Sequence, residues 1–199
     1  MMLCYQFYES SHNLLKLRGI ETMAVKVNKK ELLYAGRVFK LMRENITLEN
    51  GVTTSLDIVR HPGASAMVPI YDTNTVLLIK QYRHAVGGFI WEVPAGTFND
   101  SEAPLECAKR ELVEETGFSA ETWEKLGEIT PVPGYSDERI HVFLASDLRP
   151  ARQNLDSDEV LSVHKIKLND VIDMVNKGEI QDSKTISSLF MAINWLKKG

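Results

Sequence analysis

Apolar and polar residues alternate along most of the chain, and this pattern predicts a fold rich in strands. The stretches 38–47 and 53–60 flank Asn50-Gly51, a pair that tolerates positive φ and is typical of hairpin turns. A second hairpin is expected from 64–71 and 75–82, where an apolar run (Val76 to Ile79) is typical of a buried strand. Further strands are expected at residues 89–93, 123–129, 140–145 and 160–166.

Three helices are predicted in the second half of the chain. The first spans 104–116, because Pro104 suits a first helical turn and Gly117 suits the position after the last turn. The other two fit residues 168–176 and 183–197. Strands and helices do not alternate one by one, so we expect an α/β fold of the α+β kind, with a mixed sheet flanked by helices.

The composition is that of a folded domain. Hydrophobic residues make up 44% of the 199 residues and charged residues 25%, which excludes a disordered or low-complexity chain. The net charge of −4 argues against a nucleic-acid partner bound through a basic face. Two cysteines are too few for a disulfide framework, so a cytoplasmic location is expected, and no apolar run approaches the ~20 residues of a membrane span.

The pattern also suggests how the chain is divided. Residues 1–22 lack the uninterrupted apolar core of a secretory signal, and Met23 is a second possible start. We expect 1–22 to be an N-terminal extension. Both a disordered and an ordered extension are compatible with its sequence. A β segment at 23–62 then precedes the main domain at 63–199, because His61-Pro62-Gly63 breaks the strand pattern.

The negative charge is concentrated in one segment. Between Gly96 and Gly117 there are six acidic and two basic residues, and this difference of four equals the net charge of the chain. Glu111, Glu114 and Glu115 fall within about 100° of one helix face, where like charges repel each other. A hard divalent cation with oxygen ligands, Mg²⁺ or Mn²⁺, relieves that repulsion.

The alternative for this segment is a solvated acidic helix face, with Lys109 and Arg110 as local partners. The flanking residues favour the metal site. Gly96 follows a strand through Pro94-Ala95, and such a strand–loop–helix connection can present a backbone carbonyl beside the carboxylates.

These residues match a known family. The spacing Gly96-x5-Glu102-x7-Arg110-Glu111-Leu112-x-Glu114-Glu115-x-Gly117-Phe118 resembles the Nudix box at every defined position. The resemblance implies the Nudix fold, an α/β/α sandwich, and hydrolysis of a nucleoside diphosphate linked to another group. Residues 34–197 resemble the ADP-ribose pyrophosphatase branch in particular, through the segments 61–64, 81–83, 92–96, 133–138 and 156–159.

The resemblance also implies site residues. The metal ligands would be the Ala95 carbonyl, Glu111 and Glu115, with Glu114 and Glu159 completing or flanking a site for two or three Mg²⁺ ions, or Mn²⁺. Glu111, Glu115 and Glu159 would carry catalysis. The general base is expected in the acidic loop, at Glu159, Asp158 or Asp156; the other interpretation of that loop is a solvated turn.

Four residues are candidates for substrate binding. Arg83 follows an apolar strand and suits a phosphate, although it can also be an ordinary exposed cation. Glu92 would bind a ribose hydroxyl or a metal-bound water, or else pair with Arg83. Tyr135 and Glu138 lie in the loop after Pro133, and Tyr135 would form a wall of the substrate site.

The leading hypothesis is Mg²⁺-dependent hydrolysis of ADP-ribose, or a related ADP-sugar, to AMP and a sugar phosphate. One alternative is a pyrophosphatase for GDP-mannose or another nucleoside diphosphate sugar. A second is a non-catalytic module that only binds a nucleotide, against which the intact Glu111, Glu114 and Glu115 count. The resemblance also implies a homodimer, with the N-terminal β segment packing across the two-fold axis.

Overall fold

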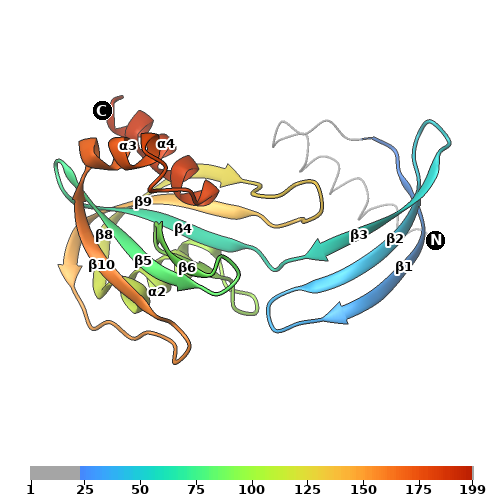
Figure 1. The fold of residues 1–199 in the computed structure, drawn as a ribbon, viewed down its shortest axis with the longest axis horizontal. Coiled ribbons are helices and arrows are strands. Elements are labelled where there is room, and N and C mark those ends of the chain that lie inside the picture. Colours follow the sequence, from blue (N-terminus) through green and yellow to red (C-terminus); the bar gives the residue numbers. More distant parts are fainter. Residues whose placement is uncertain (1–22, 199) are drawn as a thin grey trace. The chain divides into compact units, whose positions relative to one another are not determined.

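The computed structural model describes residues 23–198, so the predicted extension at 1–22 lies outside the described residues. Two compact units make up the chain (Figure 1). Of the described residues, one unit contains 23–36 together with 40–59, and the other contains 37–39 and 60–198.

The first unit is a three-stranded sheet in the order β1 (Lys26–Ala35), β2 (Lys40–Thr47) and β3 (Thr53–Arg60). The predicted turn joins β2 to β3, and Gly51 has the positive φ, 82°, that such a turn requires. Strand β1 was not predicted. All ten of its residues are exposed, so it shows no alternation of buried and exposed positions that the sequence pattern could reveal.

The second unit is built on a seven-stranded sheet. Its main path runs β10-β5-β4-β9-β8, with β6 paired to β5 and β7 paired to β4. The β4–β9 pair is parallel and the other recorded pairs are antiparallel, so the predicted mixed sheet is confirmed. The strands are β4 (Ala64–Asp72), β5 (Thr75–Arg83), β6 (Gly88–Glu92), β7 (Ala95–Thr97), β8 (Phe118–Ile129), β9 (Ile140–Pro150) and β10 (Leu161–Lys167).

Strands β8 and β9 are longer than the sequence pattern predicted. The pattern placed their outer ends at residues 123 and 145, whereas the ladder continues to the pair Phe118–Pro150. The added residues are partly or fully exposed, and among them only Ala120 and Leu148 are recorded as packing against the core. Backbone pairing therefore carries the hairpin farther than the buried positions alone indicate.

Helices cover both faces of the sheet. Helix α2 (Pro104–Thr116) packs against one face through Leu112, beside Met67 and Phe143 of the strands. Helices α3 (Leu168–Asn176) and α4 (Ser183–Leu196) cover the other face, where Leu189 packs with Val68. The result is the expected α/β/α sandwich. No helix in residues 23–198 is long and apolar enough to cross a membrane.

The sheet opens between β4 and β5, and this opening holds the site. The two strands pair only near their connecting turn, at Ile70–Val76 and Asp72–Thr75. Farther along, β6 pairs with residues 79–83 of β5 and β7 pairs with residues 64–66 of β4. The chain between β6 and β7 therefore fills the gap, held by a hydrogen bond from Met67 N to Pro94 O of 3.0 Å.

Candidate active site

Helix α2 carries the predicted carboxylates next to the filled gap. It ends at Gly117, whose left-handed φ of 71° lets its N–H bond to the Val113 carbonyl. On the buried side, Ala108 and Leu112 fix the helix against the sheet. This packing brings the segment 111–115 beside β7.

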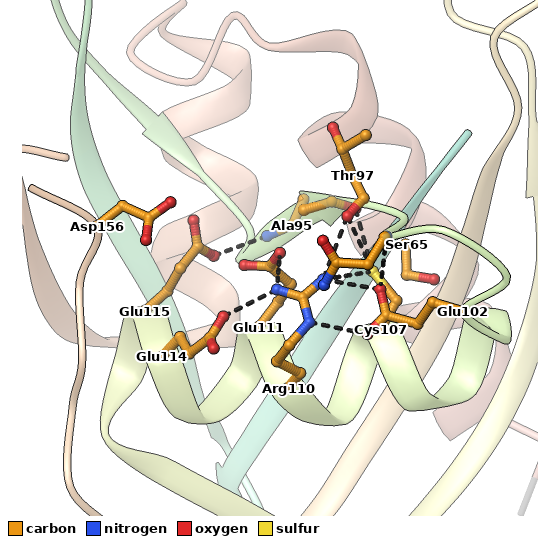
Figure 2. A network of polar contacts seen from close by, with 12 residues as sticks. Ser65, Ala95, Thr97, Glu102, Cys107, Arg110, Glu111, Glu114, Glu115 and Asp156 are labelled. Carbon is orange, nitrogen blue, oxygen red and sulfur yellow. Dashed lines mark hydrogen bonds and ion pairs between the residues drawn. The ribbon is translucent and has the colours of Figure 1, made fainter. Parts of the chain in front are cut away.

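Arg110 is the centre of the polar network (Figure 2). Its Nε and Nη2 donate to the two oxygens of Glu102 at 2.8 and 2.9 Å. Its Nη1 donates to Glu111 Oε1 at 2.6 Å and to Glu114 Oε2 at 2.8 Å. Nη2 also reaches the Thr97 carbonyl at 3.2 Å, which ties the helix to β7.

Glu115 lies on the other side of Glu111 and is almost completely buried, at 1% exposure. Its Oε2 accepts a hydrogen bond from Ala95 N at 2.8 Å. Burial raises the pKa of Glu115 well above its usual range, and the negative charges of Glu111 and Glu159 add to the shift. A buried carboxylate with so little compensation is a group that a cation would stabilise.

Glu111 lies directly against the backbone of Gly96. A Cβ at residue 96 would be 1.8 Å from Glu111 Oε1, so only glycine leaves room for this carboxylate. Burial also raises the pKa of Glu111; its contact with Arg110 opposes the shift, and Glu114 and Glu159 increase it. The glycine of the motif is therefore explained by the close approach of a carboxylate, since its own φ is ordinary.

The acidic loop is attached to the end of α2. Asn154 N donates to Glu114 O at 3.1 Å, and Gln153 Nε2 donates to Glu115 O at 2.6 Å. Within the loop, Asp156 N donates to Glu159 Oε2 at 3.0 Å. Glu159 is thereby held near the helix, close enough for its charge to act on both Glu111 and Glu115.

Arg83 and Glu92 form a second polar centre at the ends of β5 and β6. Arg83 Nε and Nη2 donate to the two Glu92 oxygens at 3.0 and 2.6 Å. Glu92 is 3% exposed, whereas the Arg83 side chain is 40% exposed. The sequence left two interpretations of Glu92 open, and the structure shows one of them, the ion pair with Arg83. Direct contact of Glu92 with substrate stays a prediction.

Tyr135 and Glu138 lie in the loop between β8 and β9. Tyr135 is exposed, and Glu138 lies 3.8 Å from His61 Nδ1. The loop is held by Asp137, which accepts from Arg60 Nη1 at 3.0 Å and from His61 N at 2.9 Å. Within the described residues, no hydrogen bond or ion pair joins Tyr135 or Glu138 to the Arg110 network, so their substrate roles stay predictions.

The donor set suits a hard divalent cation. Three glutamates (Glu102, Glu111, Glu114) share the Arg110 guanidinium, and Glu115 adds a fourth carboxylate beside them, bound to Ala95 N. As the side chains lie, no three Asp, Glu, His or Cys residues in 23–198 form a group that could hold an ion. The reason is visible in Figure 2, where Glu111 and Glu114 turn to Arg110 and Glu115 turns to Ala95 N.

Sequence reasoning missed the residues that support the site from distant parts of the chain. Lys184 Nζ lies 2.9 Å from Glu92 Oε2, and Thr185 Oγ1 accepts from Val93 N at 2.9 Å. Gln153 holds the end of α2. None of these residues belongs to a motif, and a lysine at the start of a predicted helix carries no local signal of a partner 92 residues away.

Helix α2 presents its carboxylates beside Gly96, at the opening of a mixed sheet. This arrangement is typical of the class of Nudix-type hydrolases. Residues 60–189 match the NUDIX domain family, and the chain belongs to this family. The chain is 36% identical to an ADP-ribose pyrophosphatase of Bacillus subtilis over 168 residues, covering 83% of this chain and 91% of the relative.

Two further comparisons extend this result. A GDP-mannose pyrophosphatase of Pectobacterium atrosepticum is 34% identical over 175 residues, with 81% of this chain and 88% of the relative covered. The crystal structure of an ADP compounds hydrolase matches with a TM-score of 0.78 over 89% of this chain and 97% of the other. Its sequence identity is 23%, so this match bears on the fold alone.

Proposed function

We propose that the protein hydrolyses the diphosphate bond of ADP-ribose, or of a related ADP-sugar, to AMP and a sugar phosphate. The observation that carries the proposal is the pair of carboxylates, the buried Glu115 and the partly buried Glu111, against the Ala95–Gly96 backbone. The similarity to an ADP-ribose pyrophosphatase supports the choice of substrate.

Each residue has a part in the proposed mechanism. Glu111, Glu115 and the Ala95 carbonyl would hold Mg²⁺ or Mn²⁺, with Glu114 completing the site for two or three ions and Glu159 flanking it. Such ions would supply charge neutralisation for the diphosphate and would make a water acidic enough to lose a proton near neutral pH. Glu159 would take that proton at its carboxylate, and Arg83 would donate to a phosphate oxygen through its exposed edge.

Arg110 is the counter-ion that keeps the carboxylates of Glu111 and Glu114 together before a cation binds. It pairs with Glu111 and Glu114 at 2.6 and 2.8 Å, so both must leave or share the guanidinium when they hold an ion. Its two bonds to Glu102 anchor it during that exchange. The arrangement lets the site change ligands without leaving Arg110 unpaired.

The test is a product assay with Mg²⁺ on ADP-ribose, GDP-mannose, diadenosine polyphosphates and NADH. We expect AMP from ADP-ribose at the highest kcat/KM. Dominant turnover of GDP-mannose would replace the ADP-ribose assignment by the second candidate, which the Pectobacterium relative favours. Absence of turnover of all four compounds would favour the non-catalytic module.

Glu111→Gln tests the carboxylates themselves. It keeps the size of the side chain but removes its charge, and we expect kcat to fall by about 10³-fold or more, because the ions lose a ligand. Glu106→Gln on the same helix is the matched control, since Glu106 is exposed and pairs with Lys109. An active Glu111→Gln enzyme would contradict the metal site.

The same proposal extends to the assembly. The N-terminal β segment, 23–62, would pair with a second copy of the chain, leaving 63–199 as the hydrolase domain. The support is that β1 exposes the apolar side chains of Val27, Leu32 and Tyr34, at 45, 53 and 59%. A location in the cytoplasm is part of the same proposal.

A further inference from the structure

Glu92 is a buried carboxylate with two cationic partners. Its Oε2 accepts from Arg83 Nη2 at 2.6 Å and lies 2.9 Å from Lys184 Nζ. The Arg83 side chain is 40% exposed, but Lys184 is only 13% exposed. Arg83 therefore approaches Glu92 from the solvent side of the site, and Lys184 holds it from the interior.

The first turn of α4 fixes Lys184 in place. Lys184 Nζ donates to Asp182 Oδ2 at 2.8 Å, and Asp182 caps the helix by accepting from Thr185 N at 3.0 Å. Thr185 Oγ1 donates to Asp182 at 2.6 Å and accepts from Val93 N at 2.9 Å. The helix start and the end of β6 are thus one hydrogen-bonded unit.

The unit leaves one edge of Arg83 available. Nε and Nη2 are bound to Glu92, and in the described part of the chain Nη1 has no hydrogen-bond partner. Two carboxylates, Glu92 and Asp182, balance two cations, Arg83 and Lys184. The guanidinium is therefore held along one edge, and its remaining donors can meet a phosphate oxygen.

We propose that Lys184 is a positioning residue for Arg83, acting through Glu92, and that α4 thereby sets the affinity of the site for a diphosphate. This inference rests on the proposed function, in which Arg83 contacts the diphosphate of the substrate. Without Lys184, Glu92 loses its interior partner, and both the carboxylate and the guanidinium bound to it gain freedom to move. A guanidinium that is displaced by about 1 Å loses much of its contribution to binding.

The test measures binding of ADP in EDTA by calorimetry, so that neither catalysis nor a metal ion enters the readout. We expect Lys184→Met to weaken ADP binding about tenfold, which is about 1.4 kcal/mol. Lys184→Arg should retain affinity within about threefold, because it keeps the cation. Lys197→Met, at the exposed C-terminal end of the same helix, is the control and should bind as wild type.

A double-variant cycle distinguishes the positioning role of Lys184 from a purely structural role. In a Glu92→Gln background the route from Lys184 to Arg83 is interrupted, so adding Lys184→Met should cause no further loss of ADP affinity. Circular dichroism verifies that each variant is folded at the assay temperature. Unchanged ADP binding by folded Lys184→Met, or an equal loss in the Glu92→Gln background, would overturn the proposal.

The proposed function can fail separately. If the wild-type protein binds ADP but does not hydrolyse ADP-ribose, the substrate assignment fails while the Lys184 cycle still gives its answer. In kinetics with an active substrate, we expect Lys184→Met to raise KM more than it lowers kcat, because Arg83 acts on binding. A loss confined to kcat would contradict the positioning role.

Discussion

Gly96→Ala is expected to abolish most of the activity while leaving the fold intact. The new Cβ would lie 1.8 Å from Glu111 Oε1, 1.9 Å from Cδ and 2.4 Å from Cγ. Because real Cβ contacts stay beyond 3.0 Å, the carboxylate must move by 1.2 Å (3.0 − 1.8) or more. The displaced group is the end of a flexible side chain, so the cost falls on the position of the carboxylate rather than on the backbone.

The size of the effect follows from that displacement. A misplacement of about 1 Å in a catalytic group costs about 10²-fold, so we expect kcat/KM for ADP-ribose to fall by that factor, about 2.7 kcal/mol. The assay is Mg²⁺-dependent release of AMP, with a thermal melt of each variant. Gly88→Ala is the matched control, because a Cβ there meets nothing within 4 Å and the backbone has an ordinary φ. A Gly96→Ala enzyme within threefold of wild type would refute the close approach of Glu111.

Two further predictions concern stability and assembly. Arg110 lowers the pKa of Glu102 to about 2, so its ionised form stabilises the fold above pH 4.5 and this contribution is lost as the pH falls toward 2. Urea unfolding should therefore show wild type more stable than Glu102→Gln at pH 7 and the difference shrinking below pH 4.5; a constant difference would contradict the ion pair. Leu32→Glu places a charge in the exposed apolar surface of β1, and we expect light scattering to give a dimer for wild type, as proposed, and a monomer for the variant. A dimeric Leu32→Glu protein would exclude that surface as the interface.

Local chemistry explains which elements could be predicted from the sequence. The turn at Asn50-Gly51 and the ends of α2 at Pro104 and Gly117 depend on backbone preferences of single residues. Gly51 and Gly117 have the expected positive φ and Pro104 stands in the first turn of α2, whereas Asn50 does not use the positive φ that it tolerates. Strand β1 was missed because its residues are uniformly exposed. Its backbone pairing with β2 stabilises the strand, since burial of side chains does not.

The residues of the site also divide into those that the sequence could predict and those that it could not. Glu111, Glu114 and Glu115 are recognisable because helical spacing alone brings them together. The partner of Glu92 stayed open, because the sequence does not show whether a strand-end arginine faces a carboxylate or solvent. Lys184 and Gln153 were invisible, since their roles arise only when α4 and the loop after β9 pack against elements formed earlier in the chain.

The hydrogen bond between Val93 and Thr185 has a consequence for biosynthesis. It joins residues 92 positions apart, so a ribosome that has finished the Nudix box must still translate the start of α4. A nascent or truncated chain that ends before residue 182 contains every residue of the box, Arg83 and Glu92. It lacks Lys184, which pairs with Glu92, and Thr185, which bonds to Val93. Completion of the cluster of Arg83, Glu92 and Lys184 is therefore one of the late events in the synthesis of this domain.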